Sequence, residues 1–225
     1  MKRIRIPVTD KEETSAVLSL PTGKARSTAI VVAHGAGNDM NTPLLEAFSE
    51  GLAGAGYPTL RFNFLYREHG KKAPDSPAVL EKTWLAAHRF MNESSGLEVS
   101  TFVAAGKSMG GRIASQMVAS GILPAAGLVF LGYPLHPAGS REKLRDAHLY
   151  DIMVPMLFFA GTRDPLCDLR LLDAVLKRLR HQWDLHTIEG GDHSFHVPKS
   201  AGLGDREIFS AIIKKTLEWL SKRME

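Results

Sequence analysis

The feature that most constrains this chain is a glycine-rich turn, GKSMG at residues 106–110, between two stretches of different character. Residues 99–105 form a short apolar run typical of a fully buried strand, and residues 112–119 are typical of a helix. A strand that enters a helix through Gly-x-Ser-x-Gly turns so sharply that the serine takes a positive φ angle. We therefore predict backbone strain at Ser108, with the flanking glycines removing side chains that would collide with the turn.

The same turn predicts an exposed hydroxyl. Ser108 would stand above the carboxyl edge of a sheet, at a helix N-terminus whose free N–H groups favour developing negative charge. A serine in that position can act as a nucleophile. The motif alone also fits an idle serine in a glycine-rich turn, so the rest of the chain has to decide between the two interpretations.

The whole chain alternates strand-like and helix-like stretches. Expected strands cover residues 3–8, 14–20, 28–33, 57–64, 99–105, 127–132, 154–160 and 183–188. Expected helices cover residues 44–54, 77–92, 112–119, 144–149, 168–179 and 206–222. This alternation predicts an α/β fold, with a mostly parallel twisted sheet of about eight strands, helices on both faces and an antiparallel edge pair. In such sheets functional groups gather at the carboxyl ends of the strands.

Composition limits the classes of partner. With 225 residues and a hydrophobic fraction of 44%, we expect one globular domain over residues 1–225. The net charge of +4 is scattered, which argues against a nucleic-acid partner. No apolar run is long enough for a membrane span and no apolar leader is visible, so we expect no membrane partner. The single cysteine, Cys167, suits a reducing cytoplasm. The oligomeric state does not follow from the sequence.

A serine nucleophile needs a base, and the base needs an orienting carboxylate. His193 is our candidate base, because it follows the last expected strand in a Gly-Gly turn that can return an imidazole over the sheet. Asp164 is the candidate acid, directly past another buried strand. The order Ser108, Asp164, His193 along the chain matches a triad on a sheet of this kind. His196 and Asp168 are the alternatives for base and acid.

Hydrolysis also needs two N–H donors for the negative charge of the tetrahedral intermediate. One donor is expected from Met109, the residue after the serine. The other is expected from the loop HGAG at residues 34–37, with Ala36 as first choice and Gly37 as second. We expect His34 to brace this loop. The histidines and acids lack the spacing typical of a metal site, so no metal is expected.

Four motifs together carry a family resemblance: HGAG at residues 34–37, GKSMGG at 106–111, GTRDP at 161–165 and GDHSF at 191–195. Over essentially the whole chain they resemble the α/β-hydrolase superfamily. GKSMGGR, GYPLHPAG and GTRDPL are similar to a small cap-less group, the testis-expressed/KANSL-type α/β-hydrolase-like proteins near the dienelactone hydrolases. The superfamily resemblance implies hydrolysis of esters, thioesters, amides or lactones through an acyl-enzyme, without a cofactor. The narrower group implies less, since some of its members act as scaffolds.

The residues and the resemblance together predict a cytoplasmic serine hydrolase, carboxylesterase-like, acting on a small-molecule ester, thioester or lactone. The alternative is a non-catalytic binding or scaffold protein with the same fold. That alternative predicts loss of a triad residue, and none is missing. Lys107, before the serine, departs from the commonest hydrolase pattern, and we expect it to face solvent.

The length of one connection bears on the substrate. Only residues 133–153 separate two expected strands at the position where many hydrolases insert a cap domain. We therefore expect no cap and an open, shallow site suited to small or short-acyl esters. Candidates for lining it lie just past strand ends: Asn38, Met40, Phe64, Tyr133 and His136.

Overall fold

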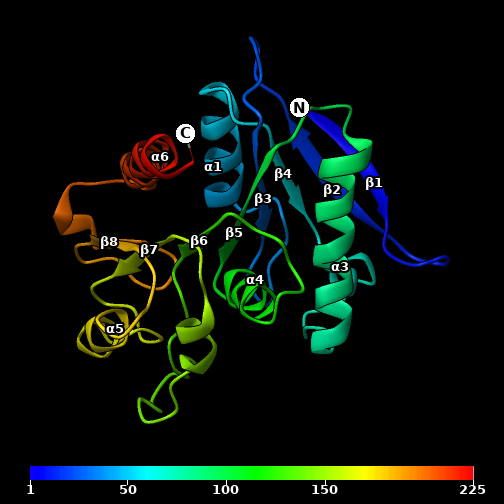
Figure 1. Cartoon of the computed structure of the whole chain (residues 1–225). Helices are drawn as coiled ribbons and strands as arrows, with labels where there is room; N and C mark the ends of the chain where they lie inside the picture. The colour runs from blue at the N-terminus through cyan, green and yellow to red at the C-terminus, as the bar shows by residue number, and fades with distance from the viewer. Residues whose placement is uncertain (225) are drawn as a thin grey trace.

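A computed structural model describes residues 1–224 (Figure 1). Its strands are β1 (Lys2–Pro7), β2 (Glu13–Ser19), β3 (Thr28–Ala33), β4 (Thr59–Phe62), β5 (Thr101–Lys107), β6 (Gly127–Leu131), β7 (Met156–Gly161) and β8 (Trp183–Ile188). Its helices are α1 (Pro43–Gly54), α2 (Leu65–Glu68), α3 (Pro77–Arg89), α4 (Met109–Ala119), α5 (Leu169–Leu176) and α6 (Asp205–Arg223). Short turns of π-helix (Phe90–Ser94) and 3₁₀-helix (Ala147–Asp151 and Lys199–Ala201) complete the elements.

The strands form one sheet in the order β1-β2-β4-β3-β5-β6-β7-β8. β3 to β8 are parallel, whereas β2 pairs antiparallel with both β1 and β4. The predicted α/β architecture, with its antiparallel edge pair, is confirmed. Pro7 lies on the edge strand β1, a position in a sheet where proline is tolerated.

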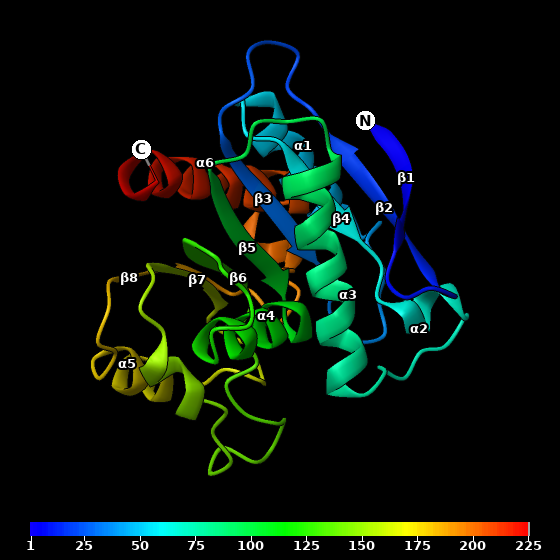
Figure 2. The same ribbon diagram turned by 45° about the vertical axis from the view of Figure 1, so that its right-hand side comes forward.

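Two helical layers cover the sheet (Figures 1 and 2). α1 and α6 pack on one face, and α3, α4 and α5 pack on the other. Side chains of β5 alternate between these layers: Phe102 and Ala104 contact one core, and Val103 and Ala105 contact the other. Burial on both faces explains why the inner strands are continuously apolar rather than alternating.

Several expected boundaries differ from the structure. The expected strand over 57–64 is confined to β4, because the backbone N–H of Phe64 turns out of the sheet and donates to His34 Nε2 at 3.0 Å. The chain then forms the short helix α2, which the sequence analysis did not predict. Likewise, α4 begins at Met109 rather than at residue 112, so the helix starts directly after the serine.

Between β6 and β7 the chain forms only a loop with the 3₁₀ turn Ala147–Asp151, so no cap domain is inserted there. The short helix expected over 144–149 is this turn, displaced by a few residues along the sequence. Among residues 1–224, none of the helices has both the length and the apolar character needed to cross a membrane.

Candidate active site

The turn after β5 has the strained geometry that the motif predicts. Ser108 has φ +49° and ψ −114°, and α4 starts at the next residue. A Cβ on Gly110 would lie 2.6 Å from the His34 carbonyl oxygen, and one on Gly106 would collide with the backbone of Gly111. The predictions of positive φ at Ser108 and of required glycines beside it are confirmed.

Three side chains from three different loops meet above the sheet. His193 Nε2 lies 2.8 Å from Ser108 Oγ, and His193 Nδ1 lies 2.7 Å from Asp164 Oδ2. With the Nδ1 proton donated to the carboxylate, Nε2 is left as the acceptor for the serine hydroxyl. The Asp164 side chain is fully buried, whereas His193 is 21% exposed. The imidazole of His193 therefore lies between the solvent and the Asp164 carboxylate, which is shielded from water.

The loops after β7 and β8 hold the acid and the base in place. Asp164 Oδ1 accepts the backbone N–H of Leu166 at 2.8 Å, so both of its carboxylate oxygens are occupied. Beyond β8, Asp192 Oδ1 accepts the N–H groups of Ser194 and His196 at 2.7 and 3.0 Å. This turn-forming role of Asp192 was not among the predicted site features. The Asx-turn tendency of an aspartate after two glycines is the signal that could have predicted it.

His196 and Asp168, the alternatives for base and acid, interact with residues outside the triad. His196 Nδ1 lies 2.9 Å from Asp205 Oδ1, and its side chain is exposed. Asp168 forms the N-cap of α5 and accepts the N–H of Arg170 at 3.0 Å. Cys167 is buried, and burial raises the pKa of its thiol to about 12, which keeps it protonated. No group of three or more His, Cys, Asp or Glu side chains in residues 1–224 could hold a metal ion.

His34 braces the loop after β3, as expected. Its Nε2 accepts the N–H of Phe64, and its Nδ1 donates to the Gly35 carbonyl oxygen at 2.8 Å. Acceptance at Nε2 requires the neutral ring, and burial lowers the pKa of His34 to about 4. The ring also packs edge-on against Phe64 and Tyr66, with centroids 5.0 and 5.7 Å away. The loop is therefore fixed by core side chains rather than left mobile.

A cavity of about 740 Å³ opens beside the serine, and we call it the Ser108 cavity. Ser108, Ala36 and Met109 line it together, while Gly37 does not. Neither the Ala36 N–H nor the Met109 N–H donates a hydrogen bond elsewhere in the described residues. Two free backbone donors beside a nucleophile are what an oxyanion site requires.

The predicted lining of this cavity was wrong. Phe64 and Tyr133 are buried in the core, and the Met40 N–H donates to Asn63 Oδ1. His136 is buried as well, and its Nε2 accepts the N–H of Asp168 at 3.0 Å. Asn38 lines a separate hollow of about 190 Å³. Position at a strand end places a residue at the correct edge of the sheet, but it does not say whether the side chain points into the core or into the cavity.

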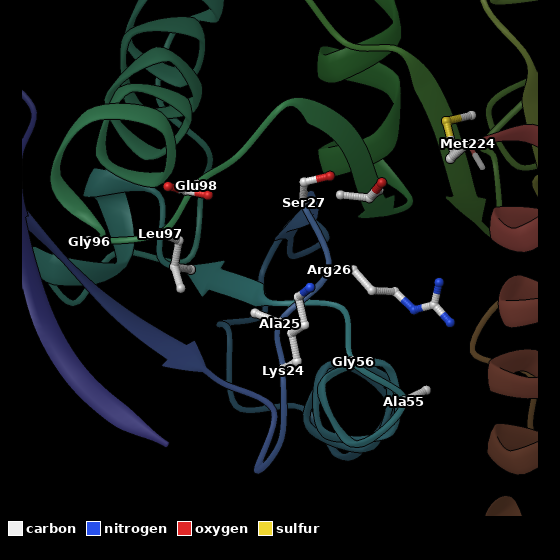
Figure 3. Close-up of a pocket in the computed structure, with 11 residues that line it drawn as sticks. Lys24, Ala25, Arg26, Ser27, Ala55, Gly56, Gly96, Leu97, Glu98 and Met224 are labelled. Atoms are coloured by element: carbon white, nitrogen blue, oxygen red, sulfur yellow. The ribbon is translucent and has the colours of Figure 1, made fainter.

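A larger hollow, of about 930 Å³, lies at the opposite end of the sheet (Figure 3). Its lining includes Lys24, Arg26 and Ser27 before β3, together with Glu98 before β5 and Met224 after α6. None of the three triad residues lies there, and it is at the amino ends of the strands. Since functional groups of parallel sheets gather at the carboxyl ends, the Ser108 cavity is the better candidate despite its smaller volume.

Lys107 does not face solvent, and this expectation is corrected. Its Nζ atom is buried without a hydrogen-bond partner among the described residues. The ammonium lies over the Phe195 ring, 5.8 Å from the centroid, and a Cβ on Gly132 would come within 3.0 Å of it. Burial lowers the pKa of Lys107 to about 8, an effect that the charges of Asp164 and Asp192 only partly oppose. The side chain alternates to the α1 and α6 face of β5 and so passes under the His193 loop.

Replacing Lys107 with methionine should stabilise the protein at neutral pH. Below pH 8 the folded state carries a buried charge, so the shift from 10.5 to about 8 costs roughly 3 kcal/mol. Between about pH 8 and 10.5 the unfolded chain binds more protons than the folded one, and wild-type stability rises with pH. The advantage of Lys107→Met should therefore be largest at pH 7 and shrink above pH 8. Urea unfolding at pH 7 and above pH 8 measures the difference in the free energy of unfolding between variant and wild type. Lys82→Met, at an exposed lysine, is the control. A difference for Lys107→Met that does not change with pH would contradict the buried charge.

The fold and the triad geometry define a class of protein, in which a mostly parallel α/β sheet carries a nucleophile turn and has no cap domain. A family model described as "Alpha/beta hydrolase domain" matches residues 26–221. The chain therefore belongs to the α/β-hydrolase superfamily.

Solved structures show the same fold at low identity. A dienelactone hydrolase from Anabaena variabilis is 18% identical with a TM-score of 0.75, over 99% of this chain and 97% of that one. Est1E from Butyrivibrio proteoclasticus, solved with ferulic acid bound, is 16% identical with a TM-score of 0.76, over 98% and 99%. A serine hydrolase without a lid from Xanthomonas campestris is 20% identical with a TM-score of 0.67, over 87% and 86%. At these identities the likeness establishes the cap-less α/β-hydrolase fold.

Proposed function

We propose that this protein is a cytoplasmic serine hydrolase that cleaves small carboxylic esters, thioesters or lactones. The observation that carries the proposal is the continuous hydrogen-bonded chain from Ser108 Oγ through His193 to Asp164. A structural serine has no need of an imidazole on its hydroxyl and a buried carboxylate behind that imidazole. This arrangement activates a hydroxyl that is otherwise a poor nucleophile.

The geometry supports a two-step mechanism. Ser108 Oγ attacks the ester carbonyl carbon while its proton passes to His193 Nε2. The carbonyl oxygen becomes an oxyanion, for which the N–H groups of Ala36 and Met109, beside Ser108 in the cavity, are the proposed donors. As the tetrahedral intermediate collapses, His193 returns the proton to the leaving alcohol or thiol, and an acyl-enzyme remains. Asp164 keeps the ring oriented and stabilises the transient imidazolium.

Water completes the reaction by the same route. His193 takes a proton from a water molecule, the resulting hydroxide adds to the acyl carbonyl, and the second tetrahedral intermediate is stabilised by the same two donors. Collapse releases the carboxylic acid and returns the proton to Ser108. A lactone differs only in that its leaving alcohol stays attached to the acyl chain, so the product is a hydroxy acid.

The missing cap supports a preference for small substrates. No domain covers the Ser108 cavity, so a long acyl chain would gain little burial from the protein. Two proteins with this fold are consistent with a small substrate: one is named dienelactone hydrolase, and the other, Est1E, was solved with ferulic acid bound. They support the reaction class and do not identify the substrate of this chain.

A series of para-nitrophenyl esters tests the substrate size. We expect kcat/KM to be highest for acetate to butyrate and to fall by about tenfold or more for dodecanoate, because the added methylenes stay in water. The measurement is initial release of nitrophenolate below the micelle concentration of each ester. A rising kcat/KM up to dodecanoate would contradict the open-site account, whereas no turnover of any ester would favour the binding or scaffold alternative.

A further inference from the structure

Two arginines line the Ser108 cavity without a carboxylate partner. Arg112 is one turn along α4 from the nucleophile, and its backbone N–H donates to the Ser108 carbonyl oxygen at 3.0 Å. Arg145 comes from the loop between β6 and β7. The side chain of Arg112 reaches Gln116 Oε1 at 3.4 Å, and that of Arg145 reaches the Pro134 carbonyl oxygen at 3.4 Å. Within residues 1–224 neither guanidinium forms an ion pair.

Other partly buried arginines of this chain are paired. Arg61 lies 3.0 Å from Glu46, Arg223 lies 3.0 Å from Asp184, and Arg67 lies 3.9 Å from Asp39. Like Arg67 and Arg223, Arg112 is partly buried, yet no carboxylate in residues 1–224 forms an ion pair with it. Burial and the charge of Arg145 both lower the pKa of Arg112. Two uncompensated like charges at the mouth of a reactive site weaken the fold, and an anionic ligand would remove that cost.

Hydrogen bonds hold the backbone at both arginines. The Tyr133 hydroxyl donates to the Arg145 carbonyl oxygen at 2.6 Å, and the Arg145 N–H donates to the Leu135 carbonyl oxygen at 2.8 Å. Ser115 Oγ donates to the Arg112 carbonyl oxygen at 2.8 Å. The backbone that carries the two guanidiniums is therefore pre-positioned, which lowers the cost of ordering them around a ligand.

His148 lies close to this part of the cavity and adds no further positive charge. Its Nε2 lies 2.8 Å from Ser115 Oγ and 3.3 Å from the Tyr133 hydroxyl. Burial, helped by the charge of Arg112, lowers the pKa of His148 to about 4, so the ring is neutral at pH 7. The positive charge in this part of the cavity is thus that of the two arginines.

Two acids line the same cavity but come from its other side. Asp75 precedes α3, where its Oδ2 accepts the N–H of Tyr66 at 2.8 Å, and Glu81 lies on α3. α4 lies between α3 and the loop from β6 to β7 (Figures 1 and 2), so the acids and Arg145 reach the cavity from different elements. In residues 1–224 neither acid forms an ion pair with Arg112 or Arg145. We call the part of the cavity that the two arginines line its basic side.

We propose that the ester substrate carries an oxyanion, a carboxylate or phosphate group, that Arg112 and Arg145 bind on the basic side of the Ser108 cavity. Guanidinium groups match both oxyanions, because their paired N–H donors bond two oxygens at once. The proposal rests on the proposed serine-hydrolase function, since it orients an ester for Ser108. It narrows the substrates from small esters in general to half-esters of dicarboxylic acids and phosphorylated esters.

Matched substrates test this specificity. The mono-para-nitrophenyl ester of adipic acid and para-nitrophenyl hexanoate have the same acyl length and differ in the terminal carboxylate. At low salt we expect kcat/KM of wild type to be at least tenfold higher for the adipate half-ester. Arg112→Gln and Arg145→Gln should each lower this ratio by about fivefold or more, whereas exposed Arg89→Gln, which removes the same charge from the surface, should leave the ratio unchanged.

A binding measurement separates this proposal from the hydrolase proposal. Calorimetry with adipate and with butyl phosphate, on wild type and Arg145→Gln, needs no turnover and distinguishes the two oxyanions. If Arg145→Gln binds these anions at least tenfold more weakly than wild type, the oxyanion site is supported, whether or not any ester is cleaved. If in addition no ester were cleaved, only the hydrolase proposal would fail. Equal kcat/KM for the two esters, with no binding of either anion, would overturn the oxyanion site while ester turnover left the hydrolase proposal intact.

Discussion

Ser108→Ala is expected to lower kcat for para-nitrophenyl acetate by about 10⁴- to 10⁶-fold relative to wild type. The hydroxyl is the atom that bonds to the substrate, and no other side chain of the described site can replace it. The proposed oxyanion donors, the N–H groups of Ala36 and Met109, remain in the variant, so a small residual rate above the uncatalysed reaction should persist. Initial rates under saturating substrate measure the effect.

A matched serine control separates chemistry from folding. Ser120 ends α4, where its hydroxyl bonds backbone carbonyl oxygens of the same helix, and Ser120→Ala should keep kcat within about twofold. Circular dichroism should show Ser108→Ala folded. A folded Ser108→Ala protein that hydrolyses the ester as fast as wild type would mean that another group is the nucleophile.

Gly106→Ala is expected to destabilise the protein by roughly 3 kcal/mol or more. A Cβ at this position would lie 2.6 Å from the Gly110 carbonyl carbon and 2.7 Å from Gly111 Cα. These are backbone atoms of the strand-to-helix turn, so they cannot rotate away as a side chain would. For a domain of this size the loss corresponds to a decrease in Tm of about 6–12 °C, measurable by thermal unfolding.

The matched control adds the same methyl group where there is room. Gly54 ends α1, and no heavy atom lies within 4 Å of the position that its Cβ would take. Gly54→Ala should therefore change stability by less than about 1 kcal/mol. Equal Tm values for Gly106→Ala and Gly54→Ala would show that the turn tolerates a side chain, and the strained geometry at Ser108 would then be in question.

Much of this architecture could be predicted because it depends on local patterns. The buried strands are recognisable as continuous apolar runs, and the turn at residues 106–110 needs glycines whatever surrounds it. The order of Ser108, Asp164 and His193 then follows from which strands they terminate. Parallel strands bring their carboxyl ends to one edge, so residues far apart in sequence are placed together by topology alone.

The remaining features depend on side-chain direction, which strand-end position does not specify. The Lys107 side chain lies on the α1 and α6 face of β5, and its ammonium is buried instead of exposed. Phe64 leaves the sheet to bond with His34 and turns into the core. The short helix α2 follows from that departure, since β4 ends earlier than its apolar sequence suggests. Arg145 enters the site from a loop that has no periodic pattern.

The central claim is that Ser108 is an activated nucleophile, and a fluorophosphonate probe tests it most directly. The probe reacts with serines whose hydroxyl is activated by a neighbouring base, and mass spectrometry identifies the modified peptide. We predict a single adduct on Ser108 in wild type, no adduct in Ser108→Ala and strongly slowed labelling in His193→Ala. A folded wild-type protein that stays unlabelled, or that is labelled at a different serine, would contradict the account.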